Sequence, residues 1–199
     1  MTVLDIRGTH GSGKSWIVHQ LIAEAITREY QSGYISEEGS TEAIATYIPT
    51  HHIAALGMYD RVCGGCDGIR SAEEVCRRVR LLAHEYTNVI LEGILVAHTF
   101  QRYANLAKEI LLSDEHHPYI FCFINTPYEV CIQRVQERRV ARGKAAEFNL
   151  FHLTQDFHRC HERLPKRFAA EGYTVEILDW ENPMPQIKAL LAPVRTLLK

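Results

Sequence analysis

The sequence predicts an α/β protein built on one parallel sheet, with helices packed on both of its faces. Short apolar runs alternate along the chain with longer segments of helical periodicity, which is the order of strand–helix–strand units. The runs are apolar throughout, as expected of strands that are covered on both faces. The chain has 199 residues, 46% of them hydrophobic, and its composition shows no linker or repeat. One domain spanning residues 1–199 is therefore predicted.

The chain opens with a strand and a helix. Val3–Ile6 is an apolar run that ends before a glycine, and Ser15–Glu29 carries one apolar face at helical spacing. Gly33–Ser36 is predicted as the second strand and Thr41–Tyr47 as a short helix.

The middle of the chain continues this alternation. Ser71 is predicted to cap a helix, because Glu74 follows three residues later and completes a capping box. The apolar segments Asn88–Leu91 and Tyr119–Ile124 are predicted as the third and fourth strands, with the helix Phe100–Leu112 between them.

Helices dominate the last third of the chain. Tyr128–Arg139 follows the fourth strand, and Asn149–Ala170 is a long helical segment that Pro165 is expected to interrupt or bend. Val175–Leu178 is predicted as the fifth strand, and Ile187–Leu198 as the closing helix.

The first predicted strand and helix enclose a phosphate-binding motif. The segment GTHGSGKS matches G-x-x-x-x-G-K-[ST] at each fixed position. Its glycines let successive backbone N–H groups point at one phosphate, and the helix adds its positive end. We expect Lys14 to reach the β- and γ-phosphates of ATP and the Ser15 hydroxyl to bind Mg²⁺. The residues predicted to bind the nucleotide are Gly8, Thr9, His10, Gly11, Ser12, Gly13, Lys14 and Ser15.

Other features narrow the class of nucleotide-binding protein. The sequence has no Asn/Thr-Lys-x-Asp segment for reading guanine, and it is short for a transport or motor ATPase. Its net charge of −2 gives no overall basic field for nucleic acid, so any such binding needs a local patch. No apolar run approaches the roughly 20 residues that span a bilayer, and no secretory signal is recognised. A cytoplasmic protein is predicted, in the host cytoplasm if the chain is encoded by a phage.

The motif and the order of elements resemble the nucleoside and nucleotide kinases among P-loop proteins. This resemblance implies a three-layer P-loop NTPase fold with five parallel strands in the order 2-3-1-4-5. It also implies transfer of the γ-phosphate of a nucleoside triphosphate to an acceptor hydroxyl.

A carboxylate and a group of arginines extend the predicted site. Glu92 follows the apolar strand NVIL, where it can hold Mg²⁺ directly or through water, or simply cap the next turn. Arg134, Arg138 and Arg142 share a helix face, which suits a lid over residues 134–147 that closes on the triphosphate. Arg138 and Arg142 are the first choices for catalysis, and a solvated helix face is the alternative.

Several acids could activate the acceptor hydroxyl. Asp67, within a glycine-dense loop, is the first candidate for the general base, and Glu37, which follows the second predicted strand, is the next. Either could instead be a turn-forming acid. Trp180, after the fifth predicted strand, could stack on the base of the nucleotide or belong to the core or surface.

Two cysteines of the same loop have metal-site spacing. Cys63 and Cys66 form one C-x-x-C pair, but the sequence has no second pair, so ordinary reduced thiols are preferred to half a zinc site.

The P-loop, the Tyr59–Asp67 loop and the pair Glu92-Gly93 together resemble bacteriophage 5-hydroxymethyluridine DNA kinases. The resemblance implies that the acceptor is the 5-hydroxymethyl group of a modified base in DNA. It further implies that Asp67 is the base and Gly64-Gly65 the acceptor loop. The basic segments 134–144 and 159–167 would contact DNA. A kinase of a free nucleoside, nucleotide or other small metabolite is the alternative, and a nucleotide-binding regulatory module is a second one.

Overall fold

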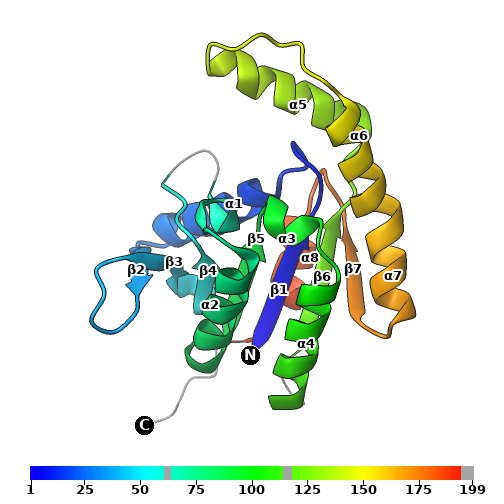
Figure 1. Cartoon of the computed structure of the whole chain (residues 1–199). Coiled ribbons are helices and arrows are strands. Elements are labelled where there is room, and N and C mark those ends of the chain that lie inside the picture. Colours follow the sequence, from blue (N-terminus) through cyan, green and yellow to red (C-terminus); the bar gives the residue numbers. More distant parts are fainter. Residues whose placement is uncertain (61–63, 114–117, 194–199) are drawn as a thin grey trace.

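The computed structural model describes residues 1–60, 64–113 and 118–193. These residues form one seven-stranded sheet in the order β2-β3-β4-β5-β1-β6-β7, with helices on both faces (Figure 1). The strands are β1 (Thr2–Arg7), β2 (Gly33–Ser36), β3 (Ala43–Ile48), β4 (Ile53–Leu56), β5 (Asn88–Glu92), β6 (Tyr119–Ile124) and β7 (Thr174–Leu178).

The predicted five-stranded parallel sheet of order 2-3-1-4-5 is wrong. The sheet is mixed, because β2 pairs antiparallel with β3 and β3 pairs antiparallel with β4. Thr41–Tyr47, predicted as a helix, contributes instead to β3, where Ile44, Thr46 and Ile48 supply the β-branched side chains that suit a strand. The prediction also missed β4, which takes the place beside β5 that it gave to Gly33–Ser36.

The remaining neighbours in the sheet run parallel. β5 and β6 flank β1, and their parallel registers bring the carboxyl ends of all three strands to one edge. Ile6, near the end of β1, pairs with Glu92 at the end of β5. The loop that follows β1 therefore lies beside Glu92, at the edge where open α/β sheets bind ligands.

Two apolar layers enclose the sheet. The helical and 3₁₀ segments are α1 (Lys14–Thr27), η1 (Pro49–His51), η2 (Gly65–Gly68), α2 (Ala72–Glu85), α3 (Ile94–Ala97), α4 (Gln101–Ser113), α5 (Tyr128–Ala141), α6 (Phe151–His158), α7 (Leu164–Ala170) and α8 (Met184–Leu190). Side chains of α2, α4 and α7 pack on one face, whereas those of α1 and α8 pack on the other. Among the described residues, no helix has the length and apolar character to cross a membrane.

Local signals explain several helix ends. Ser71 caps α2 as predicted, since its hydroxyl accepts a hydrogen bond of 3.1 Å from the Glu74 N–H. The predicted helix Asn149–Ala170 is divided into α6, the π-helical turn η3 (Arg159–Arg163) and α7, which has Pro165 in its first turn. The wider π turn fits the proline, which has no N–H to donate to the preceding turn. The predicted closing helix Ile187–Leu198 lies partly outside the described residues, and α8 ends at Leu190.

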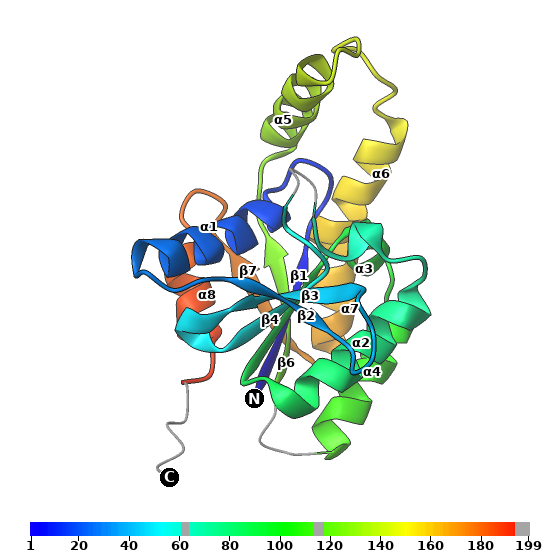
Figure 2. The same cartoon turned by 90° about the vertical axis from the view of Figure 1, so that its left-hand side faces the viewer.

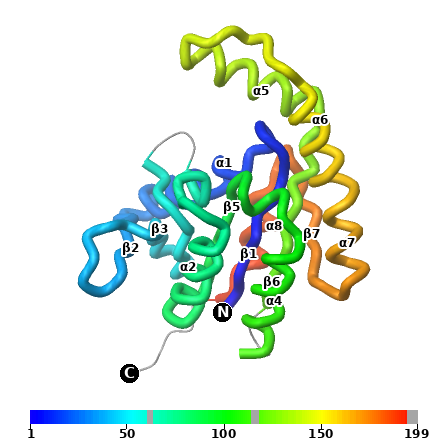
Figure 3. Tube along the Cα trace, viewed as in Figure 1, coloured from blue at the N-terminus to red at the C-terminus, as the bar shows by residue number. Residues whose placement is uncertain are grey.

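The helices α5 and α6 and their connection form an arm, residues 128–158, that stands away from the sheet (Figure 2). It leaves the body after β6 and returns through η3 and α7. The trace in Figure 3 shows that the α5–α6 connection is the part of the arm most distant from the sheet.

A buried ion pair lies at the end of β1. Arg7 is fully buried, and its guanidinium donates to both Asp5 carboxylate oxygens at 2.9 and 2.8 Å. It also donates to the Thr99 carbonyl at 2.8 Å, between α3 and α4. The rings of Phe121 and Phe168 cover it, with centroids 5.1 and 4.7 Å from Cζ. The pair therefore joins β1, the α3–α4 turn, β6 and α7.

Replacing Arg7 should lower the free energy of unfolding more than replacing a charged residue on the surface does. We expect Arg7→Met to lower the free energy of unfolding by about 3–5 kcal/mol, because it leaves Asp5 buried without its cation. Arg80→Met is the matched control, since Arg80 pairs with Glu109 on the surface and should cost at most about 1 kcal/mol. Urea denaturation of both variants measures the difference, and equal losses would contradict a special role for the buried pair.

Candidate active site

The phosphate-binding loop joins β1 to α1. Lys14 is the first residue of α1, and its Nζ donates to the carbonyls of Gly8 at 2.8 Å and Thr9 at 3.0 Å. The ammonium group is buried and folded over the loop. Its position places a positive charge, the loop N–H groups and the start of a helix around one point, which suits the binding of an anion.

Helix α5 and the residues just before it hold the loop from the other side. The Thr126 hydroxyl donates to the Ser12 carbonyl at 2.8 Å, and Arg134 donates to the Gly11 carbonyl at 3.2 Å. Gly11 has a φ of 80°, and a side chain there would collide with the backbone of Cys131 in α5. The motif thus needs glycine at this position for the close approach of α5 as well as for its own curvature.

Glu92 faces the loop from the end of β5. Its Oε1 accepts hydrogen bonds from Ser15 Oγ at 2.9 Å and from the Tyr59 hydroxyl at 3.3 Å. Burial raises the pKa of Glu92 to about 7, and the nearby charge of Asp67 adds to this effect. The positive charge of Lys14 opposes it and lowers the pKa. The Ser15 and Glu92 oxygens form the kind of oxygen pair that Mg²⁺ takes in phosphoryl-transfer sites, so the residues fit the predicted metal.

Asp67 reaches the same region from the turn η2. Its Oδ1 accepts a 2.7 Å hydrogen bond from the Ile94 N–H, which follows the pair Glu92-Gly93. Gly65, at the start of η2, has a φ of 69°, and a side chain there would collide with the Glu92 carboxylate. The turn therefore packs directly on Glu92, and two carboxylates from different elements border one cavity.

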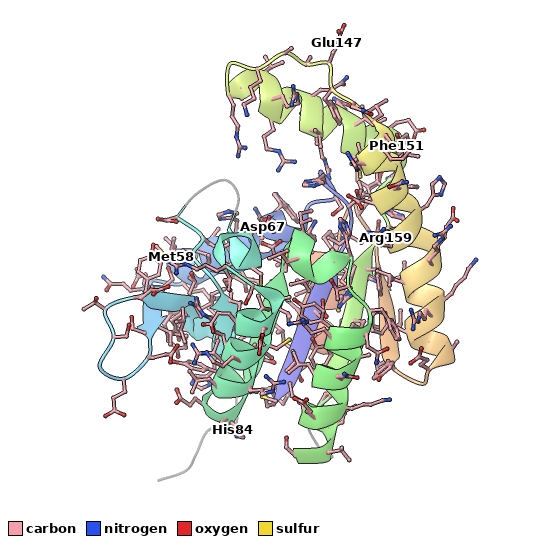
Figure 4. All side chains as sticks on the ribbon, in the orientation of Figure 1. Met58, Asp67, His84, Glu147, Phe151 and Arg159 are labelled. Atoms are coloured by element: carbon pink, nitrogen blue, oxygen red, sulfur yellow. The ribbon has the colours of Figure 1, made fainter. Side chains whose placement is uncertain are left out.

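That cavity has a volume of about 470 Å³ and lies between the body and the arm. Asp67 lies beneath the arm in Figure 4. The residues that line the cavity are His10, Gly11, Gly13, Lys14, Ser15, Trp16, Asp67, Glu92, Ile94, Arg134, Glu137, Arg138 and Ala141. The structure thus brings together the loop cation, both acids and two arginines from four elements, α1, β5, η2 and α5.

A second cavity, of about 560 Å³, adjoins the loop. Trp180 and Trp16 line it together with Ile124 and Pro183, and the Arg134 guanidinium lies 5.5 Å from the Trp180 ring centroid. Flat apolar walls beside a guanidinium suit a planar heterocycle.

Comparison with known proteins identifies the family of this chain. A family model described as 5-hmdU DNA kinase matches residues 2–170. The chain belongs to this family. It is therefore an enzyme of the kinase class, and nucleotide use follows from that class.

Relatives in the family come from several phages. The 5-hmdU DNA kinase of Pseudomonas phage PaMx11 is 28% identical over 145 residues, which cover 71% of each chain. That of Pseudomonas phage M6 is 26% identical over 198 residues, covering 96% of this chain and 98% of the relative. The one from Bacillus phage SP10 is 28% identical over 141 residues, but this match covers only 21% of that longer protein.

Two other residues predicted to belong to the site, Arg142 and Glu37, are not among the residues that line the cavity beside the phosphate-binding loop. Arg142 is exposed at the C-terminal end of α5, beyond the residues that line the cavity. Glu37 follows β2 at the outer edge of the sheet and pairs with Arg77, whose hydrogen bonds lower the pKa of Glu37. Within the described part of the chain, no cluster of three potential metal ligands occurs. Cys63 lies outside the described residues, whereas Cys66 is a buried free thiol.

The sequence analysis did not identify Tyr59 as a partner of Glu92. The two residues are 33 positions apart, and the parallel pairing of β4 with β5, which the prediction lacked, brings the ends of these strands to one edge. Arg134 was predicted only as part of the lid, but it lines both cavities and binds the phosphate loop. Its place four residues before Arg138 on one helix face was the available signal.

The pKa of Glu92 gives a stability prediction for the protein without metal or nucleotide. Folding favours the protonated carboxyl, so between pH 4.5 and about 7 the folded state keeps a proton that the unfolded state has released. The free energy of unfolding should therefore fall across this window as pH rises, by about 3 kcal/mol from this group.

Glu92→Gln should remove that slope and make the metal-free protein more stable than the parent at pH 8. Urea denaturation of both proteins at pH 5 and pH 8, with EDTA present, measures the effect. Parallel changes with pH in parent and variant would show that Glu92 is not the group responsible.

Proposed function

We propose that this kinase transfers the γ-phosphate of ATP to the 5-hydroxymethyl group of 5-hmdU in DNA. The observation that carries the proposal is the meeting of Lys14, Glu92 and Asp67 at one cavity beside the phosphate-binding loop. The relatives named 5-hmdU DNA kinase support the choice of acceptor. A hydroxymethyl group is a primary alcohol, which needs a base and charge stabilisation but no further activation.

The donor would lie along the loop and across both cavities. Residues 8–15 would hold its phosphates, and the slot between Arg134 and Trp180 would hold the adenine. Ser15 and Glu92 would bind Mg²⁺, which supplies positive charge to the phosphate oxygens. Arg138 lines the phosphate cavity on the arm side, where it would stabilise the charge of the transferring group.

Asp67 is the proposed general base. The Ile94 N–H positions its carboxylate through Oδ1, and Oδ2 would take the proton of the acceptor hydroxyl. The alcohol oxygen would then attack the γ-phosphorus, the bond to the β–γ bridging oxygen would break, and ADP would leave. A base inside a duplex must leave the stack to reach this site, so single-stranded DNA or an extruded nucleotide would be the bound form.

The acceptor is tested with γ-labelled ATP and Mg²⁺ in three parallel reactions. The acceptors are an oligonucleotide containing 5-hmdU, the same oligonucleotide with thymine, and a pool of free nucleosides and nucleotides. We expect label only in the modified oligonucleotide. Label in the free pool alone would replace the proposal by a kinase of small metabolites.

The roles of Lys14 and the two candidate bases are tested on the modified oligonucleotide. Lys14→Ala should lower kcat by about 10²–10³-fold or more, because it removes the buried cation at the phosphates. Asp67→Asn keeps the acceptor for the Ile94 N–H but cannot take a proton, so we expect unchanged ATP binding and a kcat lower by about 10²–10⁴-fold.

Glu37→Gln is the matched control for Asp67→Asn, since it also replaces a carboxylate by its amide. We expect its turnover to stay near that of the parent. Normal turnover in Asp67→Asn combined with a large loss in Glu37→Gln would assign the base to Glu37 instead.

A further inference from the structure

The end of the arm carries an excess of positive charge. We define the tip as residues 138–151, which comprise the end of α5, the connection and the first residue of α6. The tip contains four basic side chains and one acidic side chain, in a protein whose net charge is −2. Its basic residues are Arg138, Arg139, Arg142 and Lys144. Such a local excess attracts an anionic partner that the protein as a whole does not attract.

The tip also exposes large apolar side chains among these charges. The exposed fractions are 57% for Val140, 40% for Leu150 and 58% for Phe151. The arm standing away from the sheet places Phe151 at some distance from the body in Figure 4. Apolar surface surrounded by basic residues is the combination that protein surfaces use to contact single-stranded or distorted nucleic acid, with cations on phosphates and aromatic rings on bases.

Contacts within the tip hold this surface in a defined shape. Arg139 donates to the carbonyls of Ala145 at 2.8 Å and Glu147 at 3.2 Å, and its guanidinium lies 5.5 Å from the Phe148 ring centroid. The Asn149 side chain accepts a 2.9 Å hydrogen bond from the Phe151 N–H. Arg139 thus folds the connection, and Phe151 is presented at the first turn of α6 without being needed for packing. A surface fixed in advance loses less conformational entropy on binding.

Only the near part of the tip borders the nucleotide cavity. Arg138 and Ala141 line that cavity, whereas residues 142–151 are not among its lining residues. The connection between α5 and α6 is the part of the arm most distant from the sheet (Figure 3), and Phe151 lies on the returning side, where α6 begins (Figure 4). A cover for the triphosphate would not need them, but an acceptor that is a polymer continues outward from the site on both sides of the reacting nucleotide.

We propose that the tip of the arm is a docking surface for the DNA that carries the acceptor. Lys144 and Arg142 contact phosphates next to the modified nucleotide, and the Phe151 ring stacks on a neighbouring base. Extrusion of the modified base leaves its neighbour without a stacking partner, and the aromatic ring replaces that partner. This inference rests on the proposed function, since it assumes that the acceptor is part of DNA.

The test measures binding and transfer separately. Fluorescence anisotropy gives Kd for a labelled oligonucleotide containing 5-hmdU, and γ-phosphate transfer is followed on the same oligonucleotide and on free 5-hydroxymethyl-2′-deoxyuridine. We expect Phe151→Ala to raise Kd for the oligonucleotide by about 5- to 100-fold, the range for loss of one stacked base. Phe151→Trp should retain the parent Kd. Any activity on the free nucleoside should be the same in all three proteins.

Leu112→Ala is the matched control, because Leu112 is the most exposed of the large apolar residues on α4, at 85%, and lies on the body. It should leave Kd unchanged. Lys144→Ala should lower the slope of log Kd against log salt by about 1, the change expected when one phosphate contact is lost.

The outcomes separate the inference from the function on which it rests. Phosphorylation of the modified oligonucleotide with equal Kd for parent and Phe151→Ala would overturn the docking surface and leave the proposed function standing. Transfer to free nucleosides without transfer to DNA would overturn both. Tighter binding of an RNA of the same sequence would also overturn the assignment to DNA.

Discussion

The ion pair between Arg7 and Asp5 is the interaction on which the geometry of the site depends. Both side chains are fully buried at the end of β1, one residue before the phosphate-binding loop. A buried cation of this kind is tolerated only when its hydrogen bonds are satisfied. Arg7 meets that requirement by binding Asp5 and the Thr99 carbonyl, and it thereby ties the strand to the turn that ends α3. The strand that leads into the loop and the turn after α3, the helix that begins at Ile94, are therefore joined by this pair.

The active-site cavity balances opposite charges that come from different parts of the chain. Lys14 and the arginines of α5 face Glu92 and Asp67 across one space. Glu92 accepts hydrogen bonds from two hydroxyls, and Asp67 accepts one from a backbone N–H. Such carboxylates keep the capacity to bind a metal ion or a proton, which an acid already paired with arginine, such as Glu37, has largely lost.

The sequence predicted those parts of the site that depend on neighbouring residues. The phosphate-binding loop is one contiguous motif, and Glu92 lies at a strand end, so the sequence alone predicted that they would lie at the same edge of the sheet, as they do. The edge of the sheet was mispredicted, because the β-branched residues of β3 were assigned to a short helix and the strand β4 is only four residues long. The contact of Tyr59 with Glu92 and the position of Glu37 at the outer edge of the sheet depend on which distant segments pair with each other. The hydrophobic periodicity of one sequence carries no information on that pairing.

The π-helical turn between α6 and α7 has a mechanical consequence. The chain enters the arm after Pro127 and leaves it through this turn, where the helix departs from the regular α-helical pattern. Near its base the arm also packs on the phosphate loop, through the approach of Cys131 to Gly11 and the hydrogen bond from Arg134 to the Gly11 carbonyl. A bend of the arm at the π turn would displace the connection between α5 and α6 more than the base, because displacement grows with distance from the bend.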